Sequence, residues 1–166
     1  MVDVSGGGGR RSARSDEEGA AVVEFIALSL LLLVPLIYLV VTLSRVQAGS
    51  FAAEGAAHEA ARTTVVTGVA SREHGASTDL AMAAGADRAQ AAVALVADDF
   101  GFDSRDATLL LKCEGPCLEP GGNVGAQVTI TVALPGIPGF LGGAIPLSVD
   151  VVATARAPVD SVVEDQ

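Results

Sequence analysis

The chain has 166 residues and a formal net charge of −10 at neutral pH, with 20 acidic against 10 basic side chains. This acidic balance argues against a nucleic-acid-binding protein, because phosphate backbones are bound mainly by Lys and Arg. Half of the residues are hydrophobic but only 4% are aromatic, so the core of a folded domain must be lean. The length leaves room for one small domain beside a membrane segment.

The N-terminal segment is hydrophilic and rich in Gly, Ser and Arg, with four consecutive glycines. It lacks the apolar side chains needed for a core, so we predict a disordered leader over residues 1–19. Its basic residues are Arg10, Arg11 and Arg14. Positive charge beside a membrane helix favours the cytoplasmic side, so we expect the N-terminus inside the cell and the C-terminal domain outside the cytoplasm.

An apolar run follows this leader, and residues 25–43 contain no formal charge. As a helix these 19 residues would be about 28 Å long, close to the roughly 30 Å hydrocarbon core of a bilayer. We therefore predict a single transmembrane helix over residues 20–43, in the cytoplasmic membrane. Glu24 stands at the start of the run, where an isolated carboxylate is costly in lipid and favours a functional interpretation.

Residues 19–25, GAAVVEF, resemble the processing site of type IV pilin-like proteins, and more narrowly that of the TadE family of minor pilins in tight-adherence pilus systems. In such proteins a short leader ends in Gly, and the mature apolar helix has Glu at its fifth position. The resemblance implies that a prepilin-type peptidase cuts between Gly19 and Ala20. It also implies that Glu24 and Phe25 act in subunit assembly, with Glu24 pairing with the new amino group of a neighbouring subunit.

The resemblance further implies that the partners are other pilin-like subunits and the membrane assembly platform. It covers residues 19–45, and Ala20 departs from major pilins, which commonly begin with an aromatic residue. We therefore expect a minor or accessory subunit. Two other interpretations remain open: an uncleaved membrane-anchored binding domain, and a secreted protein whose signal peptide is cut near Ala48.

The membrane helix is predicted to continue over residues 45–67 as an amphipathic helix, and a break is expected over residues 68–75. One face of this helix carries small residues at three- and four-residue steps, namely Ala53, Ala57, Ala60, Ala61 and Thr64. Such a face allows close packing, either on another subunit or on the protein's own sheet.

A second helix is predicted over residues 78–97, with Ser77 or Thr78 as its cap and Asp79 in its first turn. Its apolar side is expected at Leu80, Ala84, Ala91 and Leu95. Aspartates then follow at positions 98, 99, 103 and 106. Their spacing lacks the glycine and the distal glutamate of an EF-hand loop, so we predict a solvated turn.

The last third of the chain alternates with a period of two, which is typical of strands with one buried face. Strands are predicted over residues 107–112, 127–134 and 147–156. Together with the helices they predict a membrane-anchored α+β fold. In this fold a small antiparallel sheet of about three strands is covered by alanine-rich helices.

Cys113 and Cys117 lie on the predicted extracytoplasmic side, where oxidising conditions favour a disulfide between them. Free thiols and half of a metal site are the alternatives. The metal alternative lacks partners, because the histidines, His58 and His74, lie far away in the sequence.

The segment over residues 135–146 is a candidate contact loop. It contains four large apolar residues, Ile137, Phe140, Leu141 and Ile145. Exposed apolar patches often mark contact surfaces, so we expect contact with a partner or a membrane surface, or else folding of the loop over the core. The sequence contains no nucleophile motif, Walker loop or HExxH string, so we predict neither an enzyme nor a cofactor or metal.

Overall fold

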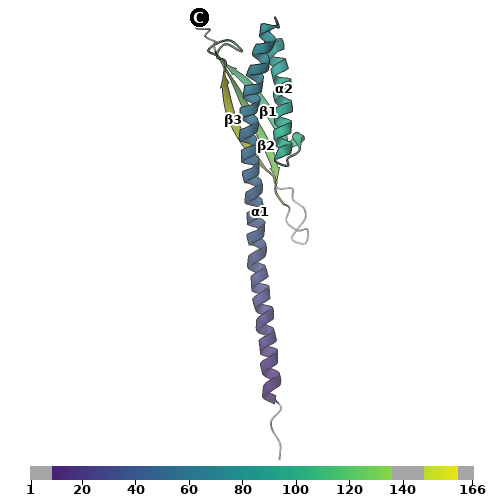
Figure 1. Ribbon diagram of the computed structural model, residues 1–166. Coiled ribbons are helices and arrows are strands. Elements are labelled where there is room, and N and C mark those ends of the chain that lie inside the picture. The colour runs from purple at the N-terminus through teal and green to yellow at the C-terminus, as the bar shows by residue number, and fades with distance from the viewer. Residues whose placement is uncertain (1–8, 136–147, 161–166) are drawn as a thin grey trace, which may run out of the picture. The chain divides into compact units, whose positions relative to one another are not determined.

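The structure is a computed structural model that describes residues 9–135 and 148–160, with backbone only for residues 9–19. The chain divides into two compact units, Met1–Val41 and Thr42–Gln166, which we call the N-terminal and C-terminal units. The elements follow in the order α1, α2, η1, β1, β2, β3 (Figure 1). The predicted α+β class is confirmed.

Helix α1 covers Gly9–Glu73 without interruption and contains Pro35. It therefore begins inside the segment that the sequence predicts to be disordered, and it passes through the predicted break. Both differences have one physical reason: each residue added to an existing helix gains a hydrogen bond without a new nucleation cost. Gly68 weakens the helix by only about 1 kcal/mol relative to alanine, which tertiary packing outweighs.

The end of α1 is a Schellman motif. Ala76 donates its backbone N–H to the Ser71 carbonyl at 3.0 Å, and Gly75 donates to the Arg72 carbonyl at 2.9 Å. Gly75 has a φ of +87°, the left-handed conformation in which this motif favours glycine. The actual stop signal is therefore Gly75, and α1 turns there towards α2.

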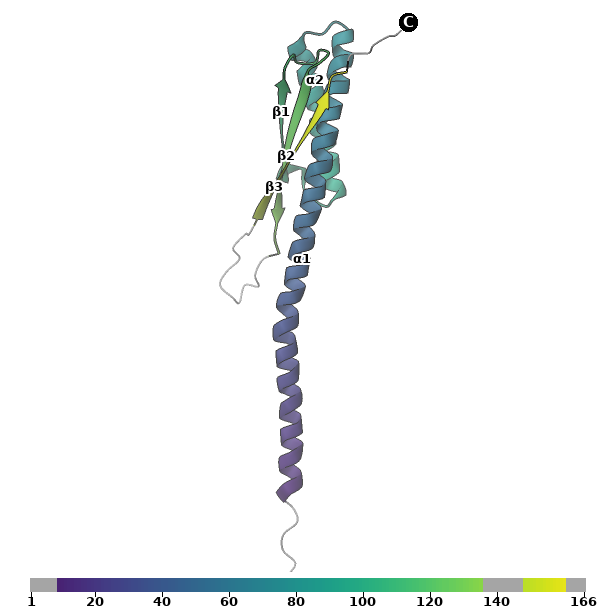
Figure 2. The same cartoon turned by 90° about the vertical axis from the view of Figure 1, so that its left-hand side faces the viewer.

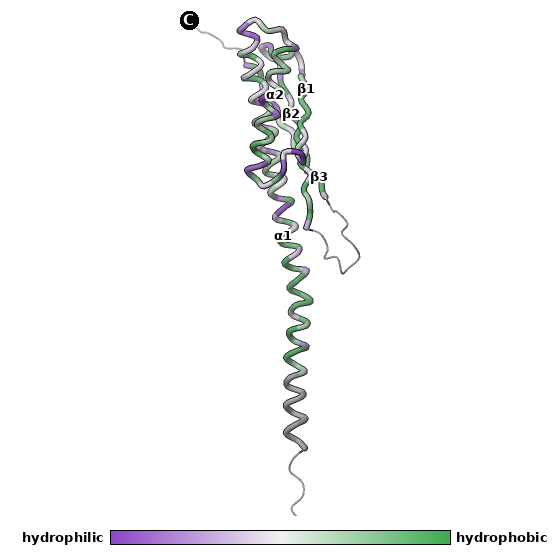
Figure 3. The backbone as a smooth tube through the Cα atoms, turned by 90° about the vertical axis from the view of Figure 1, so that its right-hand side faces the viewer, coloured by the Kyte–Doolittle hydropathy of each residue, from purple (hydrophilic) through white to green (hydrophobic). Residues whose placement is uncertain are grey.

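In the N-terminal unit, α1 presents large apolar side chains on all sides. From Val22 to Val41 these side chains are 44–73% exposed, and Figure 3 shows the hydrophobic colouring along this stretch. By length and composition α1 is able to span a membrane. Helix α2 passes the same test, but part of its surface is buried in the C-terminal unit.

Helix α2 covers Thr78–Asp99, and Ser77 caps it as predicted by accepting the Leu80 backbone N–H at 3.4 Å. The predicted apolar side is wrong, because Leu80 and Leu95 are 66% and 64% exposed. The buried side consists of small residues at four-residue steps and one valine, namely Ala81, Gly85, Ala89, Val93 and Ala97. The face with small side chains is buried because it lets α2 approach α1 closely, whereas leucines on that face would hold the helices apart.

The sheet has three antiparallel strands in the order β1-β2-β3. They are β1 (Ala107–Glu114), β2 (Asn123–Ala133) and β3 (Ser148–Pro158), and the short 3₁₀ helix η1 (Ser104–Asp106) precedes β1. Val128 at the centre of β2 pairs with Leu109 of β1 and with Ala153 of β3. The three predicted strands are therefore confirmed, with ends that differ from the prediction by at most four residues.

The core lies between one face of this sheet and the two helices, which cover it in both views (Figures 1 and 2). From β2 come the fully buried residues Val128, Ile130 and Val132. From α1 comes the predicted small-residue face, enlarged by two alanines to Ala52, Ala53, Ala56, Ala57, Ala60, Ala61 and Thr64. Of the two roles considered for this face, the structure shows packing on the protein's own sheet.

Candidate functional site

The predicted processing and assembly residues lie together in α1. Gly19, Ala20, Glu24 and Phe25 are all helical, and the last three are exposed. Ala20 and Glu24 are four residues apart, so the helix places them on one face, one turn apart. An amino group created at Ala20 would therefore lie within about one helical turn of a carboxylate.

Glu24 is an exposed carboxylate bordered by apolar residues. The ion pairs of the described residues are Arg105–Asp103 and Arg156–Glu114, so Glu24 has no cationic partner in the part of the chain that the structure describes. If the apolar stretch lies in a membrane, a carboxylate at its border gains strongly from a nearby cation, because lipid screens charge poorly. Chemically, the site fits an ammonium group.

The second candidate feature is confirmed. Cys113 and Cys117 form a disulfide, with their Cα atoms 5.3 Å apart. Cys113 belongs to β1, and Cys117 lies in the turn that leads to β2. The next residue, Leu118, is buried although the turn around it is exposed. The bond therefore closes a short loop beside an inward-pointing leucine.

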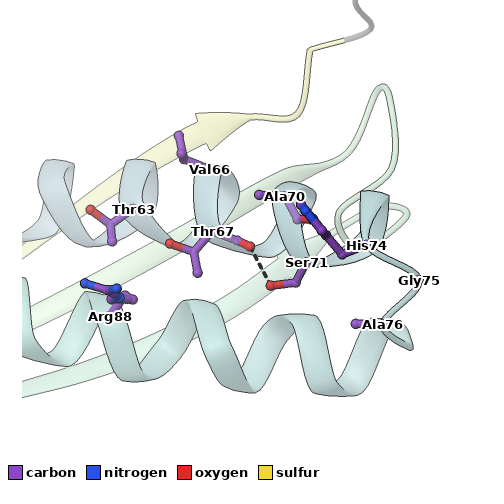
Figure 4. Close-up of a pocket in the computed structure, with 9 residues that line it drawn as sticks. All are labelled: Thr63, Val66, Thr67, Ala70, Ser71, His74, Gly75, Ala76 and Arg88. Atoms are coloured by element: carbon purple, nitrogen blue, oxygen red, sulfur yellow. Dashed lines mark hydrogen bonds between the residues drawn. The ribbon is translucent and has the colours of Figure 1, made fainter.

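A groove between α1 and α2 is a feature that the sequence interpretation missed. It has a volume of about 790 Å³ and is lined by Thr63, Val66, Thr67, Ala70, Ser71, His74, Gly75, Ala76 and Arg88. Figure 4 shows Arg88 of α2 across from the hydroxyl-bearing residues of α1. Hydroxyls at four-residue steps, at positions 63, 67 and 71, were the available signal. That Arg88 of α2 lies opposite these hydroxyls becomes apparent only once the turn between the helices is known.

The hydrogen bonds inside this groove are mostly local. Ser71 Oγ donates to the Thr67 carbonyl at 2.8 Å, and His74 Nδ1 lies 2.7 Å from the Ala70 carbonyl, to which it donates. The polar groups of the lining that are able to meet a ligand include the Thr67 hydroxyl, His74 Nε2 and the Arg88 guanidinium. The groove is open to solvent, and Arg88 gives its lining a positive charge.

The aspartate-rich turn behaves as predicted, with Asp98, Asp99, Asp103 and Asp106 all exposed. Asp103 caps η1 by accepting the Arg105 backbone N–H at 2.9 Å and forms a 2.7 Å ion pair with the same residue. These bonds hold the pKa of Asp103 well below its usual range and raise that of Arg105. No metal-binding cluster of His, Cys, Asp or Glu occurs among the residues that the structure describes.

The remaining predicted contact residues, Ile137, Phe140, Leu141 and Ile145, lie outside the described residues. Comparisons of the chain with protein-family models, with curated proteins and with solved structures found no match.

Proposed function

We propose that this chain is a minor, pilin-like subunit of a tight-adherence pilus or of a related secretion apparatus. The observation that supports this best is the placement of Gly19 and Glu24 at the N-terminal border of a charge-free stretch of helix, residues 25–43. The same helix, α1, continues into the core of a small α+β unit. Membrane anchoring and a folded head are thereby joined in one element, as a pilus subunit requires.

In this proposal the leader stays in the cytoplasm and the C-terminal unit lies outside it. A prepilin-type peptidase removes residues 1–19. Glycine at the cleavage position leaves the scissile backbone accessible, because it has no side chain. The product begins with an ammonium group at Ala20, which is the cation that Glu24 lacks among the described residues.

The role of Glu24 follows from the cost of an unpaired charge in an apolar medium. When subunits pack side by side in the membrane, a carboxylate from one and an ammonium from the next neutralise each other only in the correct axial register. An ion pair is far stronger there than in water. The pair therefore selects register during assembly.

Glu24→Gln tests this role, because it removes the charge and keeps the size. In cells that make the apparatus, we expect normal processing after Gly19 but little co-purification with other pilin-like subunits. Glu54→Gln is the matched control, because Glu54 is an exposed glutamate of the same helix within the C-terminal unit. Wild-type co-purification of the Glu24→Gln protein would refute the proposed pairing.

One observation favours a second candidate, the uncleaved membrane-anchored binding domain. The groove between α1 and α2 offers Arg88 at one end and His74 at the other to anionic ligands, without any contribution from the leader (Figure 4). The secreted alternative, with a cut near Ala48, receives no such support. Ala48 lies inside α1 and packs against the core beside the buried Gly49.

A further inference from the structure

Leu118 fills a small apolar cavity where α1 ends and α2 begins, and we call the residue the plug and the cavity the socket. It lies in the turn between β1 and β2 and is only 5% exposed. Its side chain meets α1 so closely at Gly68 that a Cβ on that glycine would lie 2.7 Å from either Leu118 Cδ atom. The socket is otherwise formed by Val65, Ala81, Met82, Leu111 and Val124.

The backbone of Leu118 adopts a conformation that leucine rarely takes. Its φ is +55°, a left-handed conformation that is unfavourable for a leucine. Burial of the side chain offsets part of this cost, since removing a leucine from water is among the larger apolar gains. Leu118 stays buried only if the turn keeps this conformation, and a constraint next to Leu118 holds the turn in place.

That constraint is the neighbouring disulfide. Cys117 precedes Leu118 directly and packs against the same cluster. Cys113 Sγ lies 3.9 Å from Met82 Sδ of α2, so the bond also contacts the helix that forms one wall of the socket. The disulfide therefore fixes the turn at the residue before the plug and rests on the socket itself.

We infer that the Cys113–Cys117 disulfide is a redox latch that keeps Leu118 in its socket and holds the adjoining ends of α1 and α2 on the sheet. A dithiol reductant opens the latch. It supplies two electrons and two protons, the S–S bond breaks, two thiols form, and the reductant becomes a disulfide. The turn then relaxes, Leu118 leaves the left-handed conformation and the socket loses its plug.

The test measures amide hydrogen exchange of the full chain in detergent micelles, oxidised and after reduction with dithiothreitol. Local opening speeds the exchange of the affected segment alone. We expect exchange about tenfold faster in residues 65–73 and 78–85 after reduction, with residues 52–61 unchanged. A Cys113→Ser/Cys117→Ser variant should show the same pattern without reductant.

Leu118→Ala separates the plug from the latch. We expect fast exchange at the helix ends in the oxidised variant, with no further increase on reduction. Leu110→Ala is the matched control, because Leu110 lies on β1 but is 49% exposed, and it should behave as the wild type. If reduction leaves the helix ends of the wild type unchanged, the latch is refuted. It is equally refuted if reduction still speeds exchange in Leu118→Ala, or if residues 52–61 open as fast as the helix ends.

Discussion

Gly85 of α2 lies directly against the backbone of Thr64 of α1. A Cβ atom on Gly85 would be 2.8 Å from the Thr64 carbonyl oxygen and 3.2 Å from its Cα. Thr64 is fully buried, and its hydroxyl donates to the Ala60 carbonyl at 2.7 Å, which leaves the buried oxygen satisfied. This contact limits how far apart the two helices lie, and it accounts for the small residues on both buried faces.

Gly85→Ala should therefore destabilise the C-terminal unit. Although alanine favours a helix, its methyl group would overlap the Thr64 backbone, and overpacking of this kind costs about 1–3 kcal/mol. Gly55→Ala is the matched control, since its Cβ would meet Val96 at an ordinary 3.8 Å. We expect that control to stabilise by up to about 1 kcal/mol. Thermal unfolding of the full chain in detergent, followed by circular dichroism, measures both, and equal stabilisation would contradict the close contact.

The corrected face of α2 gives a second prediction. Val93 is fully buried in the core, so Val93→Ala should cost about 1.5–3 kcal/mol through lost burial and the cavity left behind. Leu95→Ala removes more apolar atoms but from an exposed position, so the expected change is within about 0.5 kcal/mol. The same unfolding experiment compares them. A larger loss for Leu95→Ala would restore the face that the sequence predicts.

These two helices show how far the sequence alone leads. On α1 the alanines form one distinct small-residue face, and that face is the one buried. On α2 two apolar faces at helical spacing compete, one through Leu80 and Leu95 and one through Gly85 and Val93. Periodicity cannot choose between them, because the choice depends on the close approach to Thr64, which is a tertiary contact.

The strands and the site show the same contrast between features set by local sequence and features set by tertiary contacts. Strand β2 alternates strictly, so its buried face is readable from period alone. Gly19 and Glu24 were identified from a local sequence pattern that resembles a pilin-like processing site. The Arg88 groove and the Leu118 socket could not be identified from local sequence, because each combines residues from elements distant in sequence. The end of α1 was placed too early, since Gly68 looks like a break until its packing against Leu118 is known.

The ion pair of Asp103 and Arg105 gives a pH prediction. The pKa of Asp103 is lowered in the folded chain, so its carboxylate stabilises the fold above its ordinary pKa of about 4, and this contribution is lost as the pH falls further. Asp103→Asn keeps a helix-capping acceptor but not the charge. We expect a small stability difference from the wild type at pH 7 that shrinks steadily as the pH falls below about 4.

Asp99→Asn serves as the control for this effect, because it removes an exposed charge from the nearby last turn of α2 without breaking the ion pair. Unfolding midpoints across this acidic range compare the three proteins. A difference between wild type and Asp103→Asn that persists unchanged at pH 2 would show that the charge of Asp103 is not the cause.

The most direct test of the proposed function is the N-terminal residue and the mass of the protein purified from its own cell membranes. The proposal predicts a chain that begins at Ala20, and it predicts that a bulky substitution such as Gly19→Phe abolishes this cleavage. A chain that begins at Met1 or Val2 would contradict processing and leave a simple membrane anchor. A chain that begins near Gly49 would identify a secreted protein and refute the pilin-like assignment.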